Sequence, residues 1–170
     1  NIMEAAKEIP VKKVIMAATG GAMYGNKQTP FSEEMKEEPL SPYGISKRAG
    51  ELYLNYYHQL YHIPYISLRY SNVYGPRQNP HGESGVIAIF AEQLFQGKAP
   101  LINGDGNHTR DYVYVDDVVQ ANLLALESDF VGEVNIGTKT ETSTNEVFRK
   151  VIAEMGITVE EKHGPERPGE

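Results

Sequence analysis

Val14-Ile-Met-Ala-Ala-Thr-Gly-Gly21 is the stretch from which the fold of this chain is predicted. Five apolar residues in a row, with two glycines close behind, are typical of a short parallel strand that is buried on both faces. Tyr65-Ile-Ser-Leu-Arg69 has the same character, and a long helical pattern lies between the two segments. Strand, helix and strand in this order predict a βαβ unit, so we expect an α/β fold.

The helix between these strands has a clear start signal. Ser41 suits the N-cap, Pro42 suits the first helical position, and the pattern extends toward Tyr61. Tyr43 and Lys47 are four residues apart and therefore share one helix face. An ammonium near a phenol favours the phenolate, so the pair is a candidate general acid and base. Spacing alone fits an ordinary solvated helix turn as well, because Tyr-x-x-x-Lys occurs readily by chance.

The rest of the chain continues the alternation of helices and strands. Periodic patterns predict a helix at 86–96, a strand at 110–115, a helix from Asp116 or Asp117 to about 127, a strand at 134–136, and a last helix from the capping box Ser143-Thr-Asn-Glu146 to Gly156. Residues 75–85 are rich in Gly, Pro and polar side chains, which predicts a long loop that borders a site.

Composition excludes several classes of protein. The 170 residues are 40% hydrophobic, enough for a globular domain with a core. The net charge of -7 argues against nucleic acid or an anionic membrane as the main partner. The sequence has no cysteine and no apolar run near the roughly 18 residues of a membrane span. We therefore expect a cytoplasmic protein without disulfides or thiolate metal sites.

Two further patterns have simple structural interpretations. His58 and His62 are four residues apart on one helix, but the glutamate of a zinc protease motif is missing, so we expect no metal site. Asp116 and Asp117 are paired carboxylates that suit a helix N-terminus.

Polar residues follow the predicted strands at the edge where open α/β sheets bind ligands. Thr19 ends the first strand, and Asn72 lies just past the second. Taken alone, Thr19 is also explained as a turn residue beside Gly20 and Gly21.

Taken together, the motifs resemble the extended short-chain dehydrogenase/reductase family, most closely its UDP-glucose (UDP-galactose) 4-epimerases. The resemblance covers essentially the whole chain, in the family's order and spacing. The matching segments are Ala18-Thr-Gly-Gly-Ala-Met-Tyr-Gly25, Ser41-Pro-Tyr-Gly-Ile-Ser-Lys47, Leu68-Arg-Tyr-Ser-Asn-Val-Tyr-Gly-Pro-Arg77, Gly104-Asp-Gly106, Thr109-Arg-Asp-Tyr-Val-Tyr-Val-Asp-Asp117 and Arg167-Pro-Gly-Glu170.

The resemblance implies an NAD-dependent 4-epimerisation of a UDP-hexose, UDP-glucose or UDP-galactose. Tyr43 would take the proton of the sugar 4-hydroxyl while NAD accepts the C4 hydride, and hydride return to the opposite face of the 4-keto sugar would invert C4. Thr19 would hydrogen-bond the 4-oxygen, and Lys47 would hold the nicotinamide ribose and favour the phenolate. The other cofactor contacts that the resemblance implies are Ala17, Tyr70, Ser71 and Val73.

By the same resemblance, the nucleotide lies on residues farther along the chain. Arg110 and Arg167 would bind the diphosphate, since the planar guanidinium fork donates two hydrogen bonds to phosphate. Taken alone, either arginine is equally explained by a surface ion pair. Asn103 replaces an aromatic residue frequent in the family, so stacking on the uracil is not predicted. The remaining implied nucleotide contacts are Asn72, Val86, Ile87, Leu101 and Glu170.

The resemblance also implies a domain division and a dimer. Residues 1–74 and 111–138 would belong to a Rossmann-like NAD-binding domain with a parallel sheet, and residues 75–110 and 139–170 to a smaller nucleotide-sugar-binding subdomain. A homodimer would form through the helix from Tyr43 to Tyr61, where the cluster of Tyr53, Tyr56, Tyr57 and Tyr61 exceeds the needs of one core face.

One part of the family pattern is missing. No G-x-G-x-x-G motif occurs in the sequence, although this motif holds the NAD pyrophosphate in Rossmann domains. We therefore expect a fragment that lacks the N-terminal strands of its sheet and, by itself, binds NAD weakly and epimerises poorly.

Several alternatives stay open. A UDP-glucuronate epimerase, a decarboxylase or a reductase of the same family would share these motifs. A 4,6-dehydratase is less favoured, because Gly20 and Gly21 occupy the place of the Asp-Glu pair found in dehydratases. A nucleotide-sugar-binding fragment without catalysis is the alternative from a different class of protein.

Overall fold

The computed structural model describes residues 1–81 and 85–166, which form two compact units. The first unit comprises Asn1–Ser71 and Asp116–Gly137. The second comprises the described parts of Asn72–Val115 and Thr138–Glu170. Both units combine helices with strands, so the α/β class predicted from the sequence is confirmed.

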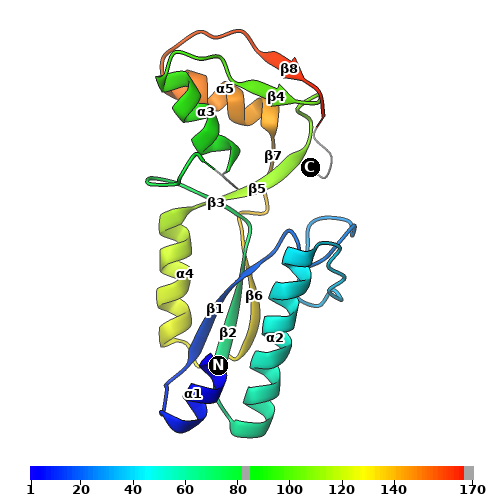
Figure 1. Ribbon diagram of the computed structural model, residues 1–170, viewed down its shortest axis with the longest axis vertical. Helices are drawn as coiled ribbons and strands as arrows, with labels where there is room; N and C mark the ends of the chain where they lie inside the picture. The colour runs from blue at the N-terminus through cyan, green and yellow to red at the C-terminus, as the bar shows by residue number, and fades with distance from the viewer. Residues whose placement is uncertain (82–84, 167–170) are drawn as a thin grey trace. The chain divides into compact units, whose positions relative to one another are not determined.

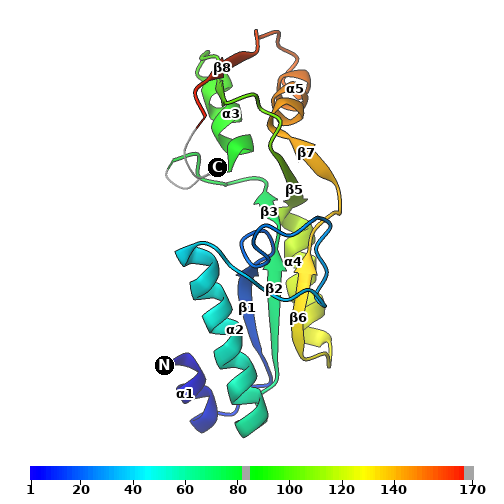
Figure 2. The ribbon, with the colours of Figure 1, turned by 90° about the vertical axis from the view of Figure 1, so that its right-hand side faces the viewer.

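The first unit is built on three parallel strands in the order β1-β2-β6 (Figure 1). The strands are β1 (Val14–Thr19), β2 (Tyr65–Tyr70) and β6 (Gly132–Ile136). The helices α2 (Pro42–Tyr61) and α4 (Val115–Glu127) cover opposite faces of this sheet, and α1 (Ile2–Glu8) packs against α2 (Figure 2). This arrangement brings the start of α2 to the end of β1.

The central strand β2 presents different chemistry to its two faces. Ile66 and Leu68 pack with Ala125 of α4 in an apolar cluster. Ser67 and Arg69 point the other way and contact Glu51 of α2. Because successive side chains of a strand alternate between faces, one short segment provides an apolar core on one side and a polar contact on the other.

The second unit holds two small sheets and two helices. The strands β3 (Asn72–Tyr74), β5 (Thr109–Tyr114) and β7 (Glu141–Ser143) form one sheet in the order β3-β5-β7. The strands β4 (Leu101–Asn103) and β8 (Lys162–Gly164) form a parallel pair. The helices α3 (Val86–Phe95) and α5 (Thr144–Glu154) pack through Phe90 and Phe148, whose ring centres lie 5.8 Å apart.

Most long elements match the sequence prediction, with differences at their ends. The capping box of Ser143 and Glu146 is present, although α5 ends at Glu154 rather than Gly156. The helix α4 begins at Val115, so Asp116 and Asp117 lie in its first turn instead of capping it.

The strands β3, β4, β7 and β8 are not predicted from the sequence, because these three-residue segments are too short to show alternation. Pairing of β3 with β5 and of β5 with β7 places residues 72–74 and 111–115 in the second unit, whereas the sequence-based division assigns them to the first part. Within residues 1–81 and 85–166, we find no helix of sufficient length and apolar character to cross a membrane.

Candidate functional site

Tyr43 and Lys47 lie on one face of α2 near its N-terminus. The helix begins where the sequence indicates, since the Ser41 hydroxyl accepts a hydrogen bond from the Gly44 amide at 3.1 Å and Pro42 takes the first position. The Lys47 ammonium nitrogen lies 5.7 Å from the centre of the Tyr43 ring. The structure therefore places a cation near a phenol, the two groups from which a general acid–base pair could be built.

Lys47 is anchored to the first strand, whereas Tyr43 is open to a ligand. The Lys47 ammonium donates a hydrogen bond to the Ala17 carbonyl oxygen at 3.0 Å, and an ammonium has two further N–H groups to offer. Tyr43 is 55% exposed, and its hydroxyl makes no hydrogen bond within residues 1–81 and 85–166. An anchored cation thus stands beside an accessible phenol.

The turn that follows Thr19 touches the start of α2. Thr19 is the last residue of β1, and its hydroxyl accepts a long hydrogen bond from the Ala22 amide at 3.5 Å. A Cβ atom on Gly44 would lie 2.4 Å from the Ala22 carbonyl oxygen, closer than any side chain allows. Glycine at this position therefore lets the helix that carries Tyr43 rest directly on the turn after Thr19.

A buried ion pair joins α2 to β2. Arg69 and Glu51 are 1% and 0% exposed, and the Nε and Nη2 atoms of Arg69 each donate to one Glu51 oxygen at 2.8 Å. Arg69 also donates to the Tyr24 hydroxyl at 2.7 Å and to Glu37 at 2.5 Å. The Ser67 hydroxyl donates to Glu51 at 2.8 Å. One guanidinium therefore binds a helix and the segment between β1 and α2 at the same time.

The partners in this network shift the pKa values of Arg69 and Glu37 toward their charged forms. Burial alone would lower the pKa of the Arg69 guanidinium, but hydrogen bonds to Glu51 and Glu37 raise it above its usual value. For the Glu37 carboxyl group, burial alone would raise the pKa. The hydrogen bond from Arg69 and the charge of Arg48 hold this pKa below its usual value. This network is not predicted from the sequence. Its signal is an arginine inside a largely apolar strand, which requires a buried partner.

Three residues expected to contact the cofactor, Tyr70, Ser71 and Val73, lie at the end of β2 and just beyond it. The Tyr70 hydroxyl accepts a hydrogen bond from the Asn122 side chain of α4 at 2.8 Å. The Ser71 hydroxyl oxygen is buried and has no hydrogen-bond partner in the described part of the chain. An unpaired buried hydroxyl is costly, which indicates that another group belongs beside it. Val73 lies in β3 of the second unit.

The first unit fits the nicotinamide end of NAD. The unpaired Ser71 hydroxyl, the remaining N–H groups of Lys47 and the polar turn at the end of β1 provide the hydrogen-bonding groups that a ribose and a carboxamide need. The sequence contains no G-x-G-x-x-G turn, so a glycine-rich cradle for the pyrophosphate is not among these 170 residues.

The second unit brings two of the expected nucleotide residues onto neighbouring strands. Asn72 lies in β3 and Arg110 in β5, and β3 pairs with β5. Both residues are exposed, and the Arg110 guanidinium donates to the Thr109 carbonyl at 2.9 Å. Arg167 and Glu170 lie outside the described residues.

The apolar residues expected at the nucleotide lie on two further elements. Val86 and Ile87 form the start of α3 and pack against the apolar core of this unit. Leu101 and Asn103 are the two ends of β4. Leu101 lies against Gly164 of β8, where an added Cβ atom would meet its side chain at 2.5 Å.

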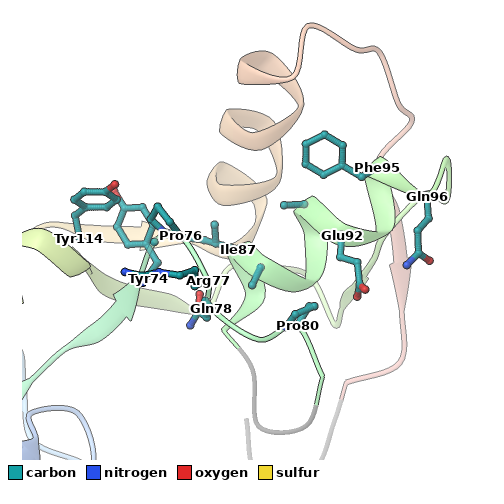
Figure 3. A pocket seen from close by; sticks show the side chains of 13 residues that line it. Tyr74, Pro76, Arg77, Gln78, Pro80, Ile87, Glu92, Phe95, Gln96 and Tyr114 are labelled. Carbon is teal, nitrogen blue, oxygen red and sulfur yellow. The ribbon is translucent and has the colours of Figure 1, made fainter.

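A pocket of about 840 Å³ opens beside α3 in the second unit (Figure 3). Tyr74 and Tyr114 line one side, and their ring centres lie 5.5 Å apart. The loop 75–80 and one face of α3, including Ile87 and Phe95, line the rest. Among the described residues expected at the nucleotide, Ile87 alone lines this pocket. Arg110 and Asn103 lie elsewhere in the unit, so the pocket and the expected nucleotide contacts overlap only at α3.

His58 of α2 has structural partners, and His62 caps the end of the helix. The His58 Nδ1 atom lies 3.1 Å from the Ile63 carbonyl oxygen, and the His58 ring packs edge-on against Tyr65. His62 ends the helix in the left-handed conformation, with φ of 55°. In the part of the chain that the structure describes, no cluster of three or more His, Asp or Glu residues is arranged to hold a metal ion.

Comparison with known proteins links this geometry to a family. The sequence profile of the NAD dependent epimerase/dehydratase family matches residues 1–137. A UDP-glucose 4-epimerase of Mycolicibacterium smegmatis is 45% identical over 172 residues, which span 100% of this chain and 55% of the relative.

Solved structures show the same relationship. The UDP-glucose 4-epimerase of Thermotoga maritima with UDP-glucose gives a TM-score of 0.94 at 45% identity, over 99% of this chain and 55% of that one. The UDP-glucuronic acid 4-epimerase of Bacillus cereus, in complex with UDP-glucuronic acid and NAD, gives a TM-score of 0.88 at 36% identity, over 99% and 54%. The chain therefore spans about half the length of the relatives it matches. With a family match over residues 1–137 and a parallel sheet that places Thr19 at a strand end, the chain belongs to the NAD-dependent epimerase/dehydratase family.

Proposed function

We propose that the protein inverts C4 of a UDP-hexose, UDP-glucose or UDP-galactose, in an NAD-dependent reaction with a 4-keto intermediate. The observation that carries the proposal is the exposed Tyr43 beside the anchored Lys47, at the carboxyl end of a parallel sheet. The similarity to UDP-glucose 4-epimerases supports the same reaction class.

In this proposal the residues of the first unit handle the proton. The Tyr43 phenolate accepts the proton of the sugar 4-hydroxyl and returns it after inversion, and the Lys47 ammonium stabilises that phenolate. The Thr19 hydroxyl donates a hydrogen bond to the same oxygen. Bound NAD would supply the hydride acceptor and donor at C4. Lys47 and Ser71 would hold its nicotinamide ribose and carboxamide, and the other contacts would be Ala17, Tyr70 and Val73.

We place the nucleotide on the second unit. Arg110 and Arg167 would bind the diphosphate, because a guanidinium recognises phosphate oxygens with paired hydrogen bonds. Asn72 and Glu170 would add polar contacts. The uridine would lie against the start of α3 and against β4, where Val86, Ile87 and Leu101 would provide apolar contacts and Asn103 a polar one.

A second candidate substrate is UDP-glucuronate, which the related epimerase of Bacillus cereus binds. Product analysis by proton NMR decides between the substrates, after separate incubation of the intact protein and NAD with UDP-glucose, UDP-N-acetylglucosamine and UDP-glucuronate. We expect UDP-galactose from UDP-glucose. Conversion of UDP-glucuronate alone would favour the second candidate, and inversion of none of the three would refute the proposed function.

We also propose that α2 forms a homodimer contact. Part of its tyrosine cluster is already used by α1, because the Tyr57 hydroxyl donates to Glu4 and the Lys7 ammonium lies 4.4 Å from the centre of the Tyr61 ring. Tyr53 and Tyr56 stay exposed and suit a partly apolar interface.

Sedimentation velocity tests the contact. The wild-type protein should sediment as a dimer, and Tyr53→Lys should shift it toward the monomer. A control substitution of the exposed Phe95 in α3, Phe95→Lys, should leave the sedimentation coefficient unchanged. A wild-type monomer at micromolar concentration would refute the dimer.

A further inference from the structure

We propose that Arg69 and Glu51 are positioning residues for the acid–base pair of α2. Their buried ion pair sets the place of α2 on the sheet, and thereby the place of Tyr43 and Lys47 at the end of β1. This proposal rests on the proposed function, since it concerns the same reaction.

The contacts along α2 are one helical turn apart. Glu51 lies one helical turn beyond Lys47 and therefore on the same face. Lys47 donates to Ala17 of β1, whereas Glu51 accepts from Arg69 of β2. The register pairs Ala18 with Arg69, so the two contacts fall on adjacent strands at nearly the same level of the sheet. Two successive turns of the helix are thus each held by a polar contact to the sheet.

The Arg69 guanidinium also contacts the segment before α2. Its other hydrogen bonds go to Tyr24 and Glu37, which both lie in the segment between β1 and α2. Arg48 of α2 contacts Glu37 and Glu51, each at 3.1 Å. The segment that contains the Thr19 turn is therefore fastened to the same pair that holds the helix. Displacement of one carboxylate would loosen both sides of the acid–base site.

A buried ion pair contributes little net stability. Transfer of two charges out of water costs nearly as much as their attraction returns, so apolar side chains of similar volume often replace a buried ion pair with no loss of stability. Apolar contacts, however, do not fix the orientation of one element on another. The planar guanidinium fork fixes the orientation of its partner, because each N–H group must point at its own acceptor. The pair is therefore better suited to placing the helix than to stabilising the fold.

The test uses substitutions at the pair in the intact protein. Glu51→Gln removes the charge and keeps the size of the side chain, and Glu51→Asp keeps the charge in a side chain that is one methylene shorter. The double variant Glu51→Leu with Arg69→Met replaces the pair by apolar side chains. Glu133→Gln is the matched control, because this glutamate accepts a hydrogen bond from Tyr65 at 3.0 Å, and Tyr65 contacts α2 at His58, three helical turns beyond Lys47.

Two readouts separate positioning from stability. Amide hydrogen exchange measures how well the first turns of α2 are held, and it needs neither cofactor nor substrate. We expect the amides of residues 46–48 to exchange at least tenfold faster in Glu51→Gln and Glu51→Asp than in the wild-type protein. The exchange rate of the Leu68 amide in β2 should change less. Turnover of UDP-glucose, measured well below the melting temperature, should fall at least tenfold in kcat with KM changed less than twofold. Glu133→Gln should change neither quantity.

The double variant gives the decisive comparison. We expect its melting temperature to return toward that of the wild-type protein while kcat stays at least tenfold lower. Recovery of kcat together with stability would overturn the proposal, because the pair would then act only on stability. Unchanged exchange of residues 46–48 in both Glu51 variants would overturn it as well. A wild-type protein that inverts no UDP-sugar would refute the proposed function, while the exchange data would still show whether the pair places α2.

Discussion

Replacement of Gly44 by alanine tests whether α2 rests directly on the turn after β1. A Cβ atom at this position would lie 2.4 Å from the Ala22 carbonyl oxygen and 3.0 Å from the Pro39 Cβ atom. Ordinary contact begins at 3.4 Å, so the helix and the turn must separate by about 1 Å. The obstacle is backbone, and no rotation of a side chain relieves it.

The expected loss of stability follows from two opposing effects. Overpacking of this kind costs about 1–3 kcal/mol. Alanine regains up to about 1 kcal/mol, because it favours a helix more than glycine does. We therefore expect Gly44→Ala to lower the free energy of unfolding by about 1 kcal/mol and by no more than about 2 kcal/mol, measured by urea denaturation with circular dichroism.

Gly50→Ala is the matched control on the same helix. The added Cβ atom would meet the Met16 Cε atom at 2.6 Å, which is the end of a flexible side chain. Because methionine adapts to a new neighbour, the gain in helix propensity should dominate, and stability should stay constant or rise by up to about 1 kcal/mol. If Gly44→Ala proved as stable as Gly50→Ala, the close contact between α2 and the turn would not exist.

Two further predictions concern charge. Because the pKa of Glu37 lies below its usual value of 4.5, its contribution to stability is present above about pH 4.5 and is lost as the pH falls through the lower, folded value. Thermal melts between about pH 6 and 3 should therefore show a smaller loss of stability for Glu37→Gln than for the wild type, and equal slopes would contradict this. Arg110→Gln should weaken UDP binding about tenfold or more in calorimetry, since a charged hydrogen bond contributes about 1.5–3 kcal/mol. The exposed Arg149, which pairs with Glu161, provides the control Arg149→Gln, and equal affinity of the two variants would exclude Arg110 from the site.

The start of α2 was predictable because its signals are local. Ser41, Pro42 and the four-residue spacing of Tyr43 and Lys47 are all visible within one turn of helix. The three-residue strands β3, β4, β7 and β8 were not predictable, because they depend on partners that are distant in the sequence. Leu101 of β4 pairs with Lys162 of β8, and a three-residue strand exists only through such a distant partner.

The same distinction applies to the site. The sequence places Tyr43 beside Lys47, but the bond from Lys47 to Ala17 joins residues that are 30 positions apart. The pairing of Arg69 with Glu51 spans 18 positions and depends on the helix lying over the sheet. Sequence patterns identify which groups have useful chemistry, whereas the tertiary contacts that hold those groups appear only in the structure.

Turnover of Tyr43→Phe in the intact protein tests the central claim most directly. The substitution removes the hydroxyl that would take the proton of the sugar 4-hydroxyl and leaves the ring in place. With NAD and UDP-galactose, we expect the variant to lose C4 inversion, as measured by proton NMR, while it binds UDP with nearly the affinity of the wild type. Inversion at the wild-type rate would show that Tyr43 is not the proton-transfer group, and would contradict the account.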